Sequence, residues 1–143
     1  MPDKNFIAVG IQKAFLYNNN IVPPKNVKIT PKLPQEELIE YYKKAKVFCL
    51  FSRTEGMPNV LCEAMLNKCI PVATNVGAVE EIVKESGYVI YNYDMNEITG
   101  FINLALNASS EIGFKAMNNI IDFYSFSNRE LKIIEALTSV AEY

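Results

Sequence analysis

The sequence contains no histidine among its 143 residues, and this absence removes several kinds of chemistry from consideration. Histidine is the general base of the serine and cysteine triads, and it is the commonest side-chain metal ligand. We therefore expect no catalytic triad, no histidine-based acid–base step and no histidine-bound metal within this chain. Any reaction has to depend on carboxylates, hydroxyls, amines or the backbone.

Cysteine is also scarce, and its count argues against a disulfide framework. The chain has three cysteines, Cys49, Cys62 and Cys69, which is an odd number. Cys49 lies within a continuous apolar run that is typical of a buried strand. Free thiols in a reducing compartment fit this pattern better than disulfides do, so we expect a cytoplasmic location.

The chain lacks a strong charge of either sign and lacks long apolar runs. Its formal net charge is −2, and no basic cluster stands out. Nucleic acids and anionic membranes are therefore unfavourable partners. No apolar run approaches the ~20 residues of a membrane span, and the beginning of the chain has no signal-peptide pattern. We expect neither nucleic-acid binding nor a transmembrane segment.

The length and the pattern of short elements predict one α/β domain over residues 1–143. Apolar residues make up 50% of the chain, and 143 residues are enough for a single core. Apolar runs alternate with helical patterns, which is typical of a Rossmann-like parallel sheet with helices on both faces. The expected strands are Phe6–Val9, Val27–Thr30, Val47–Phe51, Ile70–Ala73 and Tyr88–Tyr91. The expected helices are Ile11–Tyr17, Gln35–Lys44, Pro58–Asn67, Val79–Glu85, Met95–Asn107, Glu111–Asp122 and Asn128–Ala141.

Local signals support two of these helices and exclude one nucleotide-binding motif. Asp94 is a suitable N-cap for the helix that begins at Met95. Ser127 and Glu130 form a capping box for the last helix. Gly10 follows an apolar run as in a dinucleotide fingerprint, but no further glycine follows at the required spacing.

The most informative segment joins the Val47–Phe51 strand to the helix after it. Its run of apolar residues has no alternation, which indicates a strand that is covered on both faces. Ser52–Gly56 is a polar loop, and Pro58 suits the first position of a helix. The free N–H groups of residues 59–61 would then add to the positive end of the helix dipole. This arrangement predicts a site for an anion such as phosphate.

Two carboxylates, Glu55 and Glu63, frame this helix start. The apolar stripe of the helix comprises Val60, Leu61, Ala64 and Met65. Glu63 lies roughly 130° from the centre of that stripe, at about 100° per residue, so it should face away from the core. Both carboxylates can then accept hydrogen bonds from ligand hydroxyls. Taken alone, each glutamate is also typical of a solvated surface.

The complete string resembles the donor-binding signature of the retaining glycosyltransferase family GT4, whose members have the two-domain GT-B fold. The matching elements are Glu55-Gly56-Met57-Pro58, Val60-Leu61 and Glu63-Ala64-Met65, followed by Ile70–Thr74, Val76-Gly77-Ala78, Glu81-Ile82-Val83 and Gly87–Ile90. The two glutamates form the E-x7-E pair of the family. The resemblance covers about two thirds of the chain. It implies the C-terminal, donor-binding half of a GT-B enzyme.

The resemblance also implies a role for each position. Glu55 would be the catalytic residue that hydrogen-bonds the donor sugar, as a positioning group in a front-face displacement rather than as a covalent nucleophile. Glu63 would bind the two ribose hydroxyls of the nucleotide. The backbone around the helix start would meet the sugar and diphosphate, which assigns donor binding to Gly56, Met57, Pro58, Asn59 and Val60. Leu33, at the end of the Pro31–Leu33 loop, would lie near the base.

The same resemblance implies that no metal and no cofactor is needed. The donor would be a nucleoside-diphosphate sugar such as a UDP-, GDP- or ADP-sugar. The product would belong to glycan or polysaccharide biosynthesis. The Gly-Gly of the family is Gly77-Ala78 in this chain, a change that should cost little if Ala78 has an ordinary φ.

Two family features are missing from the sequence. The N-terminal acceptor domain is absent, and so is a Gly-Arg…Lys-Gly segment that binds the donor diphosphate. Lys13 and Lys32 are weak substitutes for that segment. Phe6–Val9 would either take the place of a missing central strand or pair directly with Val47–Phe51. We expect the isolated chain to have little or no transferase activity and leave self-association open.

Two other hypotheses remain open at this point. The chain could be a non-catalytic interaction module that keeps the fold without binding a nucleotide. It could also be an epimerase-like relative that acts on a nucleotide sugar without an acceptor. The absence of histidine, and of a further carboxylate beside the Glu55 loop, argues against the epimerase.

Overall fold

The computed structural model describes residues 1–125 together with residues 128, 130, 131, 134 and 138. The chain divides into two compact units, Met1–Leu38 and Ile39–Tyr143. That these units act as one domain stays a prediction. The predicted helix over Asn128–Ala141, with its cap at Ser127, lies largely outside the described residues.

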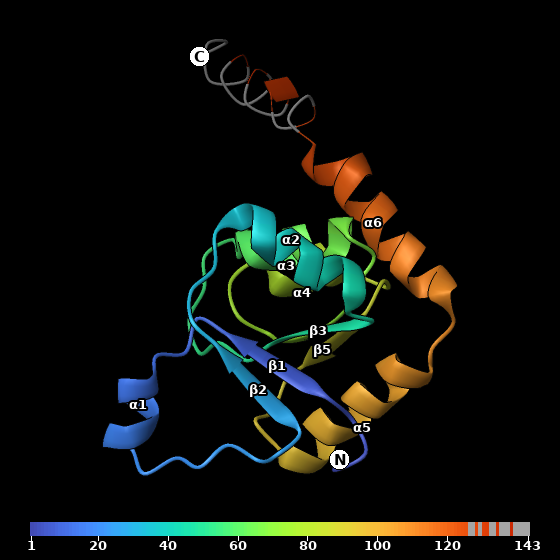
Figure 1. Cartoon of the computed structure of the whole chain (residues 1–143). Helices are drawn as coiled ribbons and strands as arrows, with labels where there is room; N and C mark the ends of the chain where they lie inside the picture. Colours follow the sequence, from blue (N-terminus) through green and yellow to red (C-terminus); the bar gives the residue numbers. More distant parts are fainter. Residues whose placement is uncertain (126–127, 129, 132–133, 135–137, 139–143) are drawn as a thin grey trace. The chain divides into compact units, whose positions relative to one another are not determined.

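The first unit is built on a two-stranded parallel sheet. Strand β1 (Phe6–Val9) pairs with β2 (Val27–Thr30), with Phe6 opposite Val27, and both strands have the predicted bounds. The short helix α1 (Lys13–Asn18) connects them (Figure 1). The sequence allowed Phe6–Val9 to pair with Val47–Phe51, whereas the structure pairs it with β2.

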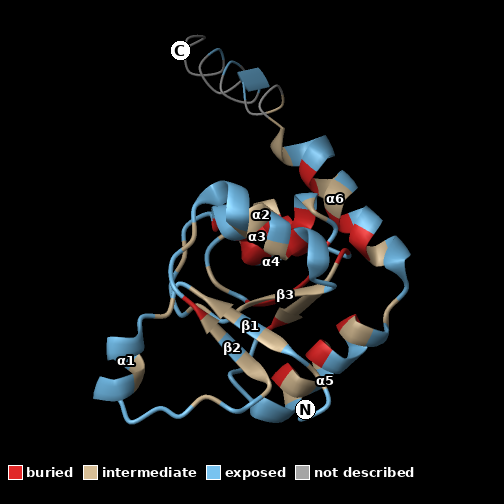
Figure 2. Cartoon of the chain, viewed as in Figure 1, coloured by how far each residue is buried: buried red, intermediate tan, exposed pale blue. Residues whose placement is uncertain are grey.

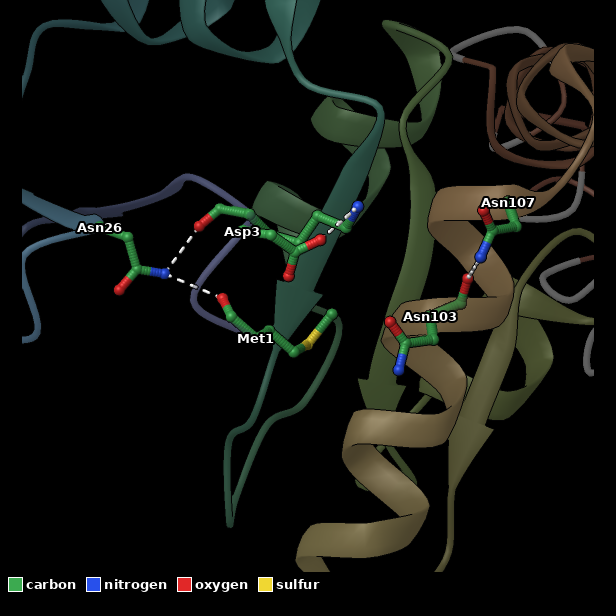
Figure 3. Close-up of polar contacts among 6 residues, drawn as sticks. Met1, Asp3, Asn26, Asn103 and Asn107 are labelled. Carbon is green, nitrogen blue, oxygen red and sulfur yellow. Dashed lines mark hydrogen bonds and ion pairs between the residues drawn. The ribbon is translucent and has the colours of Figure 1, made fainter.

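The side chain of Asn26 ties the beginning of the chain to the entry of β2 (Figure 3). Its amide nitrogen donates to the carbonyl of Met1 at 3.0 Å and to that of Lys4 at 2.7 Å. The backbone carbonyl of Asn26 accepts from the N–H of Phe6 at 2.9 Å. One residue thus satisfies three backbone groups next to the parallel ribbon.

The second unit contains a three-stranded parallel sheet in the order β3-β4-β5. Its strands are β3 (Val47–Leu50), β4 (Ile70–Thr74) and β5 (Tyr88–Ile90). All five residues of the central strand β4 are buried, as a strand covered on both faces requires. The predicted strand ends shift by one residue each. Phe51 and Tyr91 leave their strands, and Thr74 joins β4.

Helices cover both faces of this sheet. They are the end of α2 (Gln35–Lys44), α3 (Asn59–Leu66), α4 (Val79–Val83), α5 (Met95–Asn107) and α6 (Ser110–Tyr124). Helices α3, α4 and α6 pack together over one face, and α5 packs on the other (Figure 1). The predicted α/β class, with a parallel sheet between helices, is confirmed. The predicted bounds of α2 and α5 are also correct.

The core of the second unit lies between the sheet and its helices (Figure 2). Its buried residues on the α3 side are Leu61, Met65, Ala73, Val79, Ile82, Val83, Ala116 and Ile120. On α5, Ile98, Ile102 and Ala105 are buried. The carboxylate of Asp94 accepts from the N–H groups of Asn96 and Glu97 at 2.9 and 3.0 Å, so the predicted cap of α5 is confirmed.

No helix among the described residues is both long enough and apolar enough to span a bilayer.

Candidate functional site

The loop between β3 and α3 lies at the carboxyl edge of the three-stranded sheet. Because β3, β4 and β5 are parallel, the loops that follow them begin at the same edge. Ligands of open α/β sheets bind outside this edge. The β3–α3 loop carries Glu55, and the segments after β4 and β5 hold that loop in place.

The carboxylate of Glu55 has a defined partner within its own loop. The hydroxyl of Ser52 donates to Oε1 of Glu55 at 2.6 Å. Both side chains are half-buried. The bond uses acceptor capacity on Oε1 only, so Oε2 keeps its lone pairs for a ligand hydroxyl.

Two residues from neighbouring strands hold the backbone of Ser52. The hydroxyl of Thr74, at the end of β4, donates to the Ser52 carbonyl at 2.6 Å. The hydroxyl of Tyr93, in the segment after β5, donates to the same carbonyl. The sequence reasoning missed Ser52, Thr74 and Tyr93. The one available signal was that each follows, or ends, a strand of the parallel sheet.

Gly77 and Ala78 pack directly on the backbone of the Glu55 loop. Gly77 has a φ of +55°, and a Cβ at this position would lie 2.3 Å from the carbonyl oxygens of Glu55 and Gly56. The N–H of Ala78 donates to the Gly56 carbonyl at 2.9 Å. Ala78 itself has a φ of −87°, which is the ordinary φ under which an alanine was expected to cost little.

The start of α3 differs in detail from the sequence prediction. Pro58 is the N-cap and Asn59 is the first helical residue. The N–H of Leu61 donates to the Pro58 carbonyl at 3.0 Å, so it is not free as predicted. Within the described residues, the N–H groups of Asn59 and Val60 have no acceptor. They keep the helix dipole available to an anion.

The backbone before α3 offers two more donors. Among the described residues, the N–H groups of Gly56 and Met57 have no acceptor either. Met57 is 51% exposed and Val60 is 38% exposed. The prediction that Val60 belongs to the buried stripe is therefore wrong, because the stripe begins at Leu61. Both residues face solvent beside the free N–H groups.

Glu63 lies outside the buried stripe of α3, which comprises Leu61, Ala64 and Met65, and next to the side chain of Tyr42. Burial raises the pKa of the Tyr42 hydroxyl to about 12, and the negative charge of Glu63 adds to this shift. A hydrogen bond to the Glu63 carboxylate also contributes. Tyr42 comes from α2, and its ring packs edge-on against the ring of Phe48, with the two ring centroids 5.7 Å apart. Glu63 is half-buried rather than fully solvated.

The structure thus brings most of the predicted site residues together in the second unit. Glu55 and residues 56–60 lie on one loop and the helix start after it, and Glu63 follows about one turn into α3. Leu33 belongs to the first unit, between β2 and α2, where it is half-buried. Lys13 and Lys32 also belong to the first unit.

The composition of the described residues bears on metal binding and thiol chemistry. Within them, no group of three or more acidic, cysteine or histidine side chains gathers as metal ligands would. Cys49, Cys62 and Cys69 are free thiols. Burial raises the pKa of Cys49 and of Cys69 to about 11, so neither resembles a reactive thiolate.

Comparisons of sequence identify the family of this chain. The family model of glycosyl transferases group 1 matches residues 13–122. The amylovoran biosynthesis glycosyltransferase AmsD of Erwinia amylovora is 38% identical over 68 residues, which are 46% of this chain and 18% of AmsD. An uncharacterized glycosyltransferase of Haemophilus influenzae is 34% identical over 70 residues, which are 47% of this chain and 20% of that protein.

Comparisons of structure identify the fold. Sucrose-phosphate synthase of Thermosynechococcus elongatus superposes with a TM-score of 0.73 at 19% identity, over 91% of this chain and 33% of that protein. TarM superposes with a TM-score of 0.71 at 25% identity, over 90% of this chain and 28% of TarM. The α,α-trehalose 6-phosphate synthase of Burkholderia multivorans superposes with a TM-score of 0.66 at 10% identity, over 97% of this chain and 36% of that protein.

The structural neighbours are GT-B glycosyltransferases, and this chain spans about a third of their length. The family match extends over both units and includes the whole loop from Ser52 to Pro58. The chain belongs to the glycosyl transferases group 1 family.

Proposed function

We propose that this chain binds a nucleoside-diphosphate sugar and forms the C-terminal, donor-binding half of a retaining GT4 enzyme. One observation carries the proposal. In a member of this family, two half-buried carboxylates flank a helix start at the carboxyl edge of a parallel sheet, and the N–H groups of that helix start have no acceptor among the described residues. Such a helix start attracts phosphate, and carboxylates accept hydrogen bonds from sugar hydroxyls.

Each part of the donor has a partner in this proposal. The open Oε2 of Glu55 accepts from a hydroxyl of the donor sugar, with Oε1 held by Ser52. The N–H groups of Gly56, Met57, Asn59 and Val60 donate to the diphosphate. Glu63 accepts from the ribose hydroxyls with the lone pairs that Tyr42 leaves open. The assignment of Leu33 to the base rests on the family resemblance alone and stays a prediction.

The proposed reaction transfers the sugar to a hydroxyl acceptor with retention and without a metal or cofactor. Glu55 acts by positioning the sugar rather than by forming a covalent bond to it. A second domain, outside these 143 residues, holds the acceptor against the donor. Without that near-attack geometry the isolated chain has little transferase activity. The free thiols support a reducing, cytoplasmic setting.

Polysaccharide biosynthesis is the process we propose for the whole enzyme. The name of AmsD places that relative in amylovoran biosynthesis. AmsD and this chain are 38% identical over a shared segment of 68 residues.

Calorimetric titration with UDP, GDP and ADP, and with their sugars, tests the proposal. We expect one nucleotide series to bind the wild type and Glu63→Ala to weaken that binding about tenfold or more, as the loss of a charge-assisted hydrogen bond predicts. Glu111→Ala is the matched control, because Glu111 is an exposed glutamate in the first turn of α6. Binding of no nucleotide, or equal weakening by both variants, would contradict the proposal and favour an interaction module.

A further inference from the structure

Tyr93 reaches the Glu55 loop from the segment after β5. Its hydroxyl donates to the carbonyl of Ser52, and the carbonyl of Phe51 lies 3.3 Å away. The hydroxyl of Ser52 in turn donates to Oε1 of Glu55 at 2.6 Å. Two hydrogen bonds, one to the carbonyl of Ser52 and one from its hydroxyl, therefore link the segment after β5 to the carboxylate assigned to the donor sugar through the covalent frame of Ser52.

The Ser52 peptide is held from two sides. A carbonyl oxygen has two lone pairs, and the hydroxyls of Thr74 and Tyr93 use both. Thr74 is 1% exposed and sits on the central strand, so its contact is part of the rigid core. Tyr93 is 52% exposed and comes from a loop. Of the two supports, Tyr93 is the one that can be altered without disturbing the core.

The orientation of Glu55 depends on where this peptide lies. Ser52 has a single hydroxyl proton, and it is used on Oε1 of Glu55. The direction of Oε2 follows from the position of that proton. A shift of the Ser52 backbone would therefore turn the carboxylate. A displacement of about 1 Å at such a group can cost a large factor in recognition or rate.

We infer that Tyr93 is a positioning residue for Glu55 and that it governs recognition of the sugar rather than of the nucleotide. The inference rests on the proposed function, in which other groups bind the nucleotide. Those groups are the N–H donors at the start of α3 and the carboxylate of Glu63. Neither is a partner of Ser52 or Tyr93 in the hydrogen bonds of the described residues.

Tyr93→Phe isolates the hydroxyl. Phenylalanine keeps the ring, including its contact with the guanidinium of Arg53, which lies 5.7 Å from the ring centroid. Tyr91→Phe is the matched control. The Tyr91 hydroxyl is also exposed and also follows β5, but it donates to Glu80 instead of the Ser52 carbonyl.

The first measurement is calorimetric binding of each nucleoside diphosphate and its sugar to the 143-residue chain. We expect Tyr93→Phe to weaken the nucleotide sugar about three- to tenfold, the effect of one neutral hydrogen bond, and to leave the nucleotide alone within twofold. Tyr91→Phe should change neither. Equal weakening of both ligands, or of neither, in Tyr93→Phe would overturn the inference.

The second measurement needs no ligand. The side-chain carboxyl 13C resonance of Glu55 reports its surroundings, and we expect it to move in Tyr93→Phe and to stay in Tyr91→Phe. A Glu55 resonance that is unchanged in Tyr93→Phe overturns the positioning role. If the resonance moves but no nucleotide sugar binds the wild type, the proposed function fails while the structural link from Tyr93 to Glu55 stands.

Discussion

The two units of this chain are both built on parallel strands, but they differ greatly in how those strands are buried. In the first unit every residue from 1 to 38 is described, and Thr30 alone is buried. Its hydroxyl has no hydrogen-bond partner among the described residues. In the second unit all five residues of β4 are buried and three helices share one continuous core.

The difference in burial sets apart the second unit, which carries the candidate site, from the first unit, whose stability by itself should be marginal. A two-stranded sheet has little independent stability, whereas a sheet with helices on both faces can hold loops rigidly at its carboxyl edge. Glu55 and Glu63 both lie in the well-buried unit. Leu33, the residue assigned to the base, lies in the other.

The largest expected effect comes from removing a core side chain of the second unit. Leu61→Ala should lower the free energy of unfolding by about 3 kcal/mol, because Leu61 is 0% exposed and the deletion leaves a cavity. Ile7→Ala in β1 is the counterpart in the first unit. Ile7 is 51% exposed, so its loss should be below about 1 kcal/mol. Chemical denaturation of both variants measures these two losses of unfolding free energy. Equal losses would contradict the contrast between the units.

A second prediction concerns the contact that holds the Glu55 loop. Gly77→Ala should cost about 2–3 kcal/mol, since it requires a positive φ and forces a Cβ against two backbone oxygens. Gly100→Ala in α5 meets nothing within 4 Å and should instead stabilise the helix by about 1 kcal/mol. The unfolding temperatures of Gly77→Ala and Gly100→Ala, each compared with that of the wild type, measure the two effects. A Gly77→Ala protein as stable as the wild type would mean that the loop is not clamped as described.

A third prediction uses the raised pKa of Tyr42. The hydroxyl ionises near pH 10 in the unfolded chain and near pH 12 in the folded protein. The neutral form therefore contributes stability below pH 10, and this contribution is lost as the pH rises toward 12. The loss should amount to about 2 kcal/mol in wild type. It should be absent in Tyr42→Phe.

Urea titrations of both proteins between pH 9 and pH 12 measure this difference. Burial also raises the pKa values of Cys49 and Cys69, and these two thiols are present in both proteins. Parallel loss of stability in wild type and Tyr42→Phe would show that Tyr42 is not held neutral by its surroundings.

The smallest predicted effect is confined to the first unit. Asn26→Ala removes the hydrogen bonds to the carbonyls of Met1 and Lys4 and should ease local opening by about 1 kcal/mol. Amide hydrogen exchange of β1 should accelerate while that of β4 stays the same. Asn107→Ala, which removes one exposed bond to Asn103, is the control in the second unit. Faster exchange in β4 would contradict the separation of the units.

The sequence predicted the elements whose signals are local. The apolar runs Phe6–Val9 and Val27–Thr30 became strands with those bounds. Asp94 capped α5 because a cap depends on only the next few residues. The position of Glu55 on a loop between a buried strand and a helix start was also predicted, since that pattern is contained in residues 47–65.

Contacts between distant segments were the part that the sequence did not reveal. The partner of Glu63 is Tyr42, which comes from another helix, and helical periodicity says nothing about which element covers a given face. Tyr93 reaches Ser52 from a different strand end for the same reason. Pro58 also fits an N-cap and a first helical position almost equally well, because both leave its nitrogen without a required bond.

Amide-resolved NMR of the full chain during titration with UDP, GDP and ADP tests the proposed donor site. Within the part of the chain that the structure describes, the N–H groups of Asn59 and Val60 have no acceptor, and they should bind the diphosphate. We predict that their resonances shift most, together with those of Gly56 and Met57, for at least one nucleotide. Shifts confined to the hollow lined by Gly10, Ile11, Gln12 and Phe15 in the first unit, or no shifts at all, would contradict the donor site.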